Sequence, residues 1–412
     1  MAVEEFKHAR AISPYFIPGL GGSPDDFHGL TDVGADPSQA TDDVFIVGQK
    51  DKCGTERDIP ENTVPLTQLE RGEIDTYLTL ANLAAKPSGG IELDDFSNAL
   101  VDAVYYVREE EQGTVEATIW NPKTAISSFN LSVDADERIV RSIELLGENR
   151  RILNGDENKF LIYKTNTAPS GTSGAYSIDV SDPEPNVNPF NSGEFILRVD
   201  RVRAGILDTL VEGTDYTYDL GNTEIDIVAA ETGDVFQIYY SSDSFGTAGD
   251  PTTVDPDSIC FLKAENATIL IEDGNGTSVE LDNLTSLALD ATIERLNEAT
   301  IGRTDRIKEI TETPVTLSLT ARAKSDFTVE KAFMGDVDAT DMVSDINAFV
   351  ENVKVTIKIY NNSDKDTFLI GYQVDNLAFN DSSFAVTANE FSSLDFTAST
   401  TDILITDDEG DL

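Results

Sequence analysis

The sequence predicts a mainly β protein with two similar domains, each carrying one short helix, and a small β-sandwich inserted between them. Apolar and polar residues alternate at period two over many short segments, which is typical of half-buried antiparallel strands. A set of landmarks returns in the same order in the second half of the chain, and a run of short strands separated by Gly turns lies between the two sets.

The repetition is seen in a strand that ends in an aromatic residue followed by Asn. Val115–Asn121 returns as Val355–Asn361, and the turn Gly48–Lys52 returns as Gly302–Arg306. The landmarks are displaced by 254 (48 to 302), 249 (65 to 314) and 240 (119 to 359) residues. This small drift indicates insertions and deletions within a duplicated domain. Two copies are too few for a solenoid, in which several repeats stack to bury one core.

The first copy is expected to follow an irregular arm over residues 1–41, which is rich in Gly, Pro, Ser and Asp. Its expected elements are strands near 43–47 and over 66–80, a helix over 94–108, and strands at 115–120, 126–133 and 141–145. The helix is predicted because Phe96, Leu100, Ala103 and Val107 recur at helical spacing behind a capping Asp.

The second copy shows a clearer alternation. Its expected elements are strands at 314–323, 353–359, 368–374, 384–388 and 394–398, and a helix over 340–350. The last seven residues, 406–412, are acidic and are expected to be solvated and disordered.

The segment between the copies differs from both in composition. Residues 165–192 read as a linker rich in Pro, Ser, Asn and Gly, and short strands with Gly turns follow as far as residue 240. The expected division is an arm and first domain over 1–150, a linker and inserted immunoglobulin-like β-domain over 151–250, and a second domain with an acidic tail over 251–412.

The charge of the chain is strongly negative. Asp and Glu number 76 against 29 Lys and Arg, which gives a net charge of −47. With 40% hydrophobic residues the chain is too apolar to be disordered. Acid spread along the whole chain resembles proteins of salt-loving archaea, where salt screens the repulsion. A surface that repels a polyanion is a compatible alternative, and tight binding of nucleic acid is disfavoured.

Residues for catalysis or for metal binding are scarce. His8 and His28 lie in the arm and supply neither a triad nor a His-rich metal site, and Cys53 and Cys260 indicate no disulfide framework. Asp273–Thr277 is better explained by an Asn-Gly hairpin turn than by a calcium loop. We therefore expect no enzyme activity and no cofactor. No signal peptide or membrane span is expected, which favours a protein that is made and kept in the cytoplasm or built into a particle there.

A duplicated β-domain with one helix and an acidic surface resembles the major tail tube protein of long-tailed viruses. The residues that carry the resemblance are Ile126–Asp134 followed by Arg141–Gly147, and Leu284–Glu294 followed by Ile301–Arg303 and a strand over 314–323. It covers 42–150 and 258–400, about three fifths of the chain. The acidity suggests a virus that infects halophilic archaea.

This resemblance implies stacked rings of six tube domains whose inner sheets join into one hollow barrel. With two domains in each chain, three chains would complete a ring. The implied partners are copies of the chain itself, other tail proteins such as the tape measure and the tail terminator, and viral DNA that passes through the tube without specific binding. A negatively charged lumen would repel that DNA during delivery.

Five acids are predicted to line the lumen: Glu70, Glu73, Asp75, Glu390 and Asp395. For each of them an ordinary solvated position on the outside is an equal alternative. Two other functions stay open, namely a hub-like distal tail component and a halophilic cell-surface adhesive β-sandwich protein. A glycan-cleaving tail spike ranks behind both.

Overall fold

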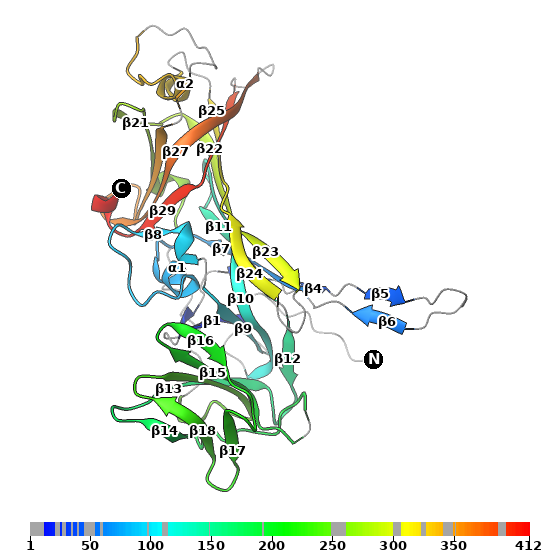
Figure 1. Cartoon of the computed structure of the whole chain (residues 1–412). Helices are drawn as coiled ribbons and strands as arrows, with labels where there is room; N and C mark the ends of the chain where they lie inside the picture. Colours follow the sequence, from blue (N-terminus) through cyan, green and yellow to red (C-terminus); the bar gives the residue numbers. More distant parts are fainter. Residues whose placement is uncertain are drawn as a thin grey trace. The chain divides into compact units, whose positions relative to one another are not determined.

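A computed structural model describes most of the chain and confirms the mainly β prediction (Figure 1). The residues that it describes are 12–20, 25–26, 30–33, 36–38, 41–44, 54–57, 61–96, 99–108, 114–147, 149–191, 193–248, 261–299, 306–322, 327–340, 349–350, 352–385 and 393–412.

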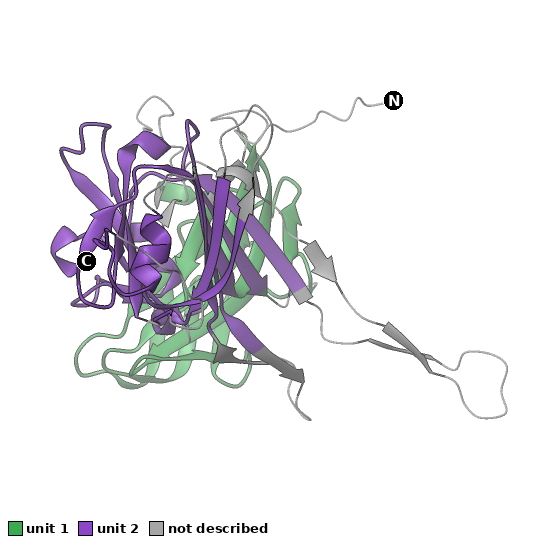
Figure 2. Cartoon of the chain, turned by 90° about the horizontal axis from the view of Figure 1, so that it is seen from above, with its two compact units in different colours: residues 1–28, 100–124, 147–255 green, residues 29–99, 125–146, 256–412 purple. Residues whose placement is uncertain are grey.

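The chain forms two compact units (Figure 2). Unit 1 contains residues 1–28, 100–124 and 147–255, and unit 2 contains 29–99, 125–146 and 256–412. Each unit is therefore assembled from three separate stretches, whereas the division expected from the sequence was contiguous.

The first repeat runs from the N-terminal strand to a strand near residue 154. Its elements are β1 (Ile12–Pro18), β2 (Asp25–Asp26), β3 (Leu30–Val33), β4 (Asp36–Ser38), β5 (Thr41–Val44), β6 (Gly54–Arg57), β7 (Glu61–Leu69), α1 (Asp75–Leu80), β8 (Ile91–Glu92), the 3-10 helix η2 (Leu93–Phe96), β9 (Val101–Arg108), β10 (Val115–Asp134), β11 (Val140–Gly147) and β12 (Arg151–Asn154).

The second repeat runs to the C-terminus. Its elements are the 3-10 helix η5 (Ala264–Asn266), β20 (Ala267–Glu272), β21 (Ser278–Glu280), β22 (Leu284–Thr292), β23 (Glu294–Ala299), β24 (Arg306–Glu312), β25 (Val315–Arg322), α2 (Thr328–Phe333), β26 (Val353–Tyr360), β27 (Phe368–Ala385), β28 (Ser393–Thr400), β29 (Asp402–Thr406) and the 3-10 helix η7 (Glu409–Asp411).

The two repeats share their order of elements at a nearly constant displacement. The first residues of β7 and β25 are 254 apart, those of α1 and α2 are 253 apart, and those of β9 and β26 are 252 apart. For β10 and β27, and again for β11 and β28, the displacement is 253. The strand pairs correspond as well, since β1–β9–β10–β12 in one repeat matches β20–β26–β27–β29 in the other. The structure thus supports the predicted duplication with a better alignment than the sequence landmarks provided.

Each repeat has one long strand that belongs to two sheets. The first half of β27 pairs with β26 and β29, and its second half pairs with β28. Between the halves, Asn376 adopts a left-handed φ of 54°, and Lys123 of β10 adopts 52° at the equivalent place. Both strands then carry a bulge, between Ile126 and Ser128 and between Phe379 and Asp381.

The helix predicted over 94–108 is wrong. Residues 93–96 form η2, and β9 follows at Val101, pairing with both β1 and β10. Seven of the eight residues of β9 are buried, so the strand is covered on both faces. A strand of this kind reads as a continuous apolar run, in which a helical spacing of large residues also occurs.

Other local predictions need correction. The arm over 1–41 contains strands, since β1 pairs along its whole length with β9. The second half of the strand expected over 66–80 is the helix α1. The acidic tail is ordered and ends in η7. Most of the helix predicted over 340–350, together with Gly48–Lys52 and the start of Gly302–Arg306, lies outside the described residues.

The middle segment forms a β-sandwich within unit 1. Its strands are β13 (Phe160–Thr167), β14 (Ser173–Asp179), β15 (Ile196–Arg203), β16 (Ile206–Thr209), β17 (Tyr216–Asp219), β18 (Glu224–Glu231) and β19 (Val235–Ser242), with the 3-10 helix η3 (Gly246–Ala248) after them. The orders β13-β19-β15-β16 and β14-β18-β17 differ from the immunoglobulin arrangement. Strands β13 and β14 also occupy part of the region expected to be a linker, residues 165–192.

Candidate functional site

One sheet of unit 2 joins strands of both repeats. Its order is β3 and β4, then β7, β11, β10, β22, β25, β28 and β27. The join lies between β10 and β22, where Ser128 faces Thr292 and Asp134 faces Ser286. The duplicated domains therefore share a continuous hydrogen-bonded surface within this chain.

The two faces of this sheet differ sharply in polarity. In β10 the side chains of Phe129, Leu131 and Val133 are buried, while those of Ser128 and Asn130 are partly exposed. The same alternation continues in β22, β25 and β28. Alternation of this kind shows that one face covers the core and the opposite face is open to solvent.

We call the open face the polar face. Its polar members are Thr67, Ser128, Asn130, Ser132, Asp134, Ser142, Glu144, Ser286, Asp290, Thr292, Thr316, Ser318, Thr320, Asp381, Ser383, Asp395, Thr397 and Ser399. Short side chains dominate, and they bond across strands. Asn130 Nδ2 donates to Asp290 Oδ1, and Ser383 Oγ donates to Asp395 Oδ2 at 3.1 Å.

The charge of the polar face is negative. Among the side chains that the structure describes, the face carries five acids and neither Lys nor Arg; the acids are Asp134, Glu144, Asp290, Asp381 and Asp395. Arg322 ends β25 in register with Ser393, and its side chain lies outside the described part. A phosphate chain near this surface would be repelled over roughly one Debye length, about 8 Å at physiological salt.

Of the five acids predicted to line a lumen, Asp395 lies on the polar face. Glu390 is outside the described residues, Glu73 forms an ion pair with Arg71 at 2.8 Å, and Asp75 is exposed at the start of α1. The side chain of Glu70 is fully buried in unit 2. Its carboxylate therefore belongs to the interior of this unit.

The buried Glu70 carboxylate is held by several donors. Its Oε1 accepts the amides of Arg71 at 2.9 Å and Gly72 at 2.8 Å. Its Oε2 accepts the hydroxyl of Tyr372 at 3.0 Å and lies 3.6 Å from Arg141 Nη1. A buried charge needs this density of partners to offset the loss of hydration.

Arg141 completes this cluster from β11, across the sheet from Gln68 of β7. Its Nε donates to Gln68 Oε1 at 3.0 Å, and its guanidinium lies 4.7 Å from the ring centre of Tyr77. Burial has the largest effect on the pKa of Arg141 and would lower it, but Glu70 and, after it, the phenol oxygens of Tyr77 and Tyr372 together raise the pKa above its ordinary value. Burial raises the pKa of Tyr77 and of Tyr372, so both phenols stay neutral. The cluster fixes β7, β11 and β27 to one another beneath the polar face.

A second polar cluster holds the sandwich to the sheet β1–β9–β10–β12 within unit 1. Asp102 of β9 accepts the Trp120 indole at 3.2 Å and the Lys123 amide at 2.7 Å. Arg198 of the sandwich strand β15 pairs with the same carboxylate. The Trp120 ring stacks on Tyr239 of β19, with ring centres 5.5 Å apart.

These contacts make the sandwich part of a shared core rather than a loosely tethered module. One hydrophobic cluster includes Val104, Trp120 and Leu153 of the sheet together with Val199 and Tyr239 of the sandwich. Gln237 of β19 also donates to the Pro18 carbonyl of β1 at 2.8 Å. The sandwich is therefore fixed in position within unit 1.

Sequence reasoning missed four of the five acids on the polar face: Asp134, Glu144, Asp290 and Asp381. A signal was present in the Ser-x-Asn-x-Ser-x-Asp pattern of residues 128–134, which places polar side chains on one face of a strand. The pattern alone does not show that the other face is buried against a core, nor that β10 and β22 are neighbours.

Further chemistry is limited in the described ranges. No cluster of three or more His, Cys, Asp or Glu side chains there could hold a metal ion. No helix among those residues has the length and apolar character required to cross a membrane. Asp273 sits in a β20–β21 hairpin turn, where its Oδ1 accepts the amides of Asn275 and Thr277, which confirms the hairpin reading.

The sequence matches no family model and no curated protein. Among solved structures, the chain is similar to a chain of the anti-feeding prophage (AFP) baseplate, with 11% identity and a TM-score of 0.28 over 37% of this chain and 98% of that one. It is also similar to a chain of the anti-feeding prophage tube-terminating cap, with 14% identity and a TM-score of 0.27 over 39% of this chain and 98% of that one. Similarity of this extent does not assign a function.

Proposed function

We propose that the chain is a structural tail protein of a virus, a tail tube subunit that assembles with copies of itself into stacked hollow rings. The observation that carries the proposal is the polar face: a wide sheet surface of Ser, Thr and Asn with five acids and no described Lys or Arg. A wall of this kind repels phosphate, and its described side chains include no Lys or Arg that would bind DNA.

The duplication supports the same function. Each repeat provides one set of strands to the sheet, so a chain supplies two equivalent segments of a larger wall. We infer that three chains complete a ring with pseudo-sixfold symmetry, because closure of the ring would pair the strands at the two edges of the sheet. The net charge of −47 is assigned mainly to adaptation to high salt, and the host would be a halophilic archaeon.

Cryo-EM and native mass measurement of the purified protein at molar salt test this proposal. We expect trimeric rings that stack into tubes, with the polar face toward the bore. Monomers at every salt concentration would overturn the proposal, as would tubes whose bore is lined by another surface. Single rings that never stack would favour the hub-like distal component.

A second function, a cell-surface adhesive protein, is favoured by one observation. Four exposed apolar side chains belong to the sandwich: Ile206 at 65%, Val211 at 59%, Leu220 at 56% and Val228 at 56% exposure. A surface on which such side chains form one contiguous patch would suit the binding of a partner. Binding of the isolated chain to host cells, without any self-assembly at molar salt, would favour this function over the tube.

A further inference from the structure

The join between the two repeats has a defined register. The second half of β10 runs antiparallel to β22, with Ser128 opposite Thr292, Asn130 opposite Asp290 and Asp134 opposite Ser286. The Asn130 amide donates to the Asp290 carboxylate across this join. Backbone pairing and a cross-strand side-chain contact thus hold the first repeat to the second.

The two edges of the same sheet are formed by counterparts of the two strands at this join. Strand β27 corresponds to β10, with the same pairing to its following strand and the same bulge. Strands β3 and β4 correspond to β22. Leu30 faces Gln68 and Asp36 faces Thr63 in the first repeat, while Leu284 faces Ala321 and Asp290 faces Thr316 in the second.

The match between β3–β4 and β22 extends to the irregularities. The register of β3 against β7 shifts between Leu30 and Asp32, and that of β22 against β25 shifts between Leu284 and Ser286, each 254 residues further on. One edge of the sheet is therefore formed by β3 and β4 of the first repeat, the counterparts of β22. The other edge is formed by the second half of β27 of the second repeat, the counterpart of β10.

In the part of the chain that the structure describes, the strands at both edges of this sheet have a neighbour on one side only. The second half of β27 pairs with β28, and β3 and β4 pair with β7. A strand edge exposes a row of N–H and C=O groups that bind a further strand readily. By analogy with the join of β10 to β22, the edge strand β27 would pair with a strand equivalent to β22, and β3 and β4 would pair with a strand equivalent to β10.

We propose that β27 of one chain pairs with β3–β4 of a second copy in the register of the β10–β22 join. Displacing that register by 253 residues for β27 and by 254 for β4 places Ser383 opposite Asp36 and Asp381 opposite Ser38. Ser383 and Asp36 then occupy the register positions that Asn130 and Asp290 occupy at the join inside the chain.

This contact is head-to-tail, since the two edges are different surfaces, and it repeats from copy to copy until it closes. It rests on the proposed function and specifies the partner and the residues of the ring interface. It also aligns the polar faces of neighbouring copies, because residues opposite each other on paired strands lie on one face.

Engineered cysteine pairs test the register in a Cys53→Ser, Cys260→Ser background. The test pair is Ser383→Cys with Asp36→Cys, oxidised at molar salt and separated under denaturing, non-reducing conditions. The matched control is Asn130→Cys with Asp290→Cys, which joins the equivalent positions inside one chain. The out-of-register pair is Ser383→Cys with Ser38→Cys, and Ser383→Cys alone tests pairing of two β27 strands.

We expect the test pair to form covalent multimers as completely as the control pair forms its internal bond, and the out-of-register pair to form at least tenfold less. Equal cross-linking of the out-of-register pair would overturn the proposal, and so would dimers from Ser383→Cys alone. Rings by electron microscopy without cross-linking of the test pair would overturn this interface while leaving the proposed function standing. Monomers at every salt concentration would overturn both.

Discussion

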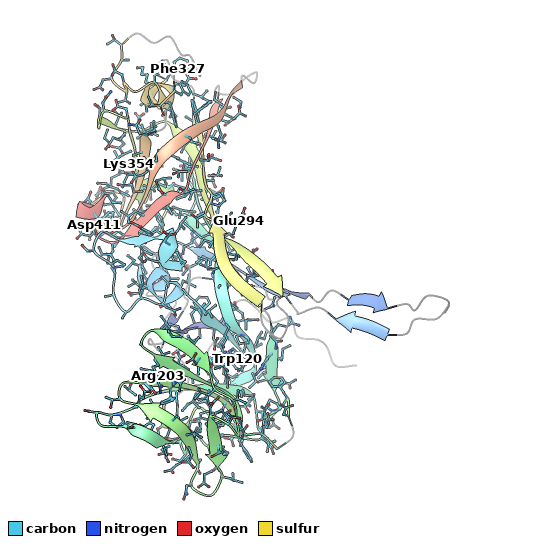
Figure 3. All side chains as sticks on the ribbon, in the orientation of Figure 1. Trp120, Arg203, Glu294, Phe327, Lys354 and Asp411 are labelled. Atoms are coloured by element: carbon cyan, nitrogen blue, oxygen red, sulfur yellow. The ribbon has the colours of Figure 1, made fainter. Side chains whose placement is uncertain are left out.

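The two repeats share one order of strands but differ in the contacts of side chains at equivalent positions. In the first repeat Trp120 of β10 and Asp102 of β9 receive the sandwich, and both side chains are almost fully buried. The equivalent residues of the second repeat are Gln373, 253 positions on, and Lys354, 252 positions on. Lys354, which is labelled in Figure 3, is partly exposed. It pairs with Glu272 at 3.2 Å. Equivalent positions in the same strand order thus make buried contacts to the sandwich in the first repeat and a partly exposed ion pair in the second.

The interior of unit 2 shows a similar contrast. Arg141 of β11 is buried beside Glu70, whereas Leu394 stands 253 residues further on at the equivalent position of β28. One repeat thus encloses a charged cluster where the other has an apolar contact.

Arg141→Leu, which introduces the residue of the second repeat, is expected to have the largest effect. It leaves the buried Glu70 carboxylate without its cation, which costs about 3–5 kcal/mol of unfolding free energy. Urea unfolding at molar salt measures the loss. The double variant Glu70→Gln, Arg141→Leu should recover most of it, and a double variant as unstable as the single one would contradict the role of the ion pair.

Asp102→Ala is expected to act within unit 1. The change removes the acceptor of the Trp120 indole and of the Lys123 amide, and it takes one carboxylate from the buried Arg198. The expected cost is about 2–4 kcal/mol. Limited proteolysis should show earlier cleavage in the sandwich, and unchanged protection there would count against the cluster as its anchor.

Lys354→Ala is the matched control at the equivalent position of the second repeat. Its ion pair with Glu272 is partly exposed, so the expected loss is below about 1 kcal/mol. The same urea experiment measures it. A loss as large as that of Asp102→Ala would show that burial is not what separates the two repeats.

The smallest effect concerns the C-terminus as pH falls. The hydrogen bond from Lys86 lowers the pKa of Asp411 below its ordinary 3.8, and that from Lys358 lowers the pKa of Glu409 below 4.5. Because both folded values are lowered, the stabilisation is present above about pH 4.5 and is lost as pH falls through the folded values. Methyl NMR signals of Leu412 should become narrow in that range. Lys86→Met should show the narrowing at neutral pH, and signals that stay broad in both cases would contradict the tether.

The sequence was sufficient for the fold class, the duplication and the presence of a sandwich. Period-two alternation and repeated landmarks can both be recognised without knowing which strands are neighbours. It was misleading for β9, whose burial on both faces removes the alternation. It also aligned Val115–Asn121 with Val355–Asn361, whereas in the structure β10 is equivalent to β27, and β26 (Val353–Tyr360) is equivalent to β9. Strands with similar composition cannot be distinguished without their neighbours.

The site was less accessible from the sequence than the fold. Glu70 and Asp395 look alike in the sequence as acids near strands, yet one is enclosed beside Arg141 and the other lies on the polar face. Which face of a strand is covered depends on residues far away in the chain. The join of β10 to β22 connects positions about 160 residues apart, a separation that no local pattern reports.

The left-handed residue in the middle of β27 has a mechanical consequence. At Asn376 one unbroken strand leaves the sheet of β26 and β29 and enters the sheet of β28. A pull along β27 must therefore shear the hydrogen bonds of both sheets together, instead of opening one of them stepwise. Under tension along this strand, the hydrogen bonds of the two sheets of the second repeat should therefore share the load.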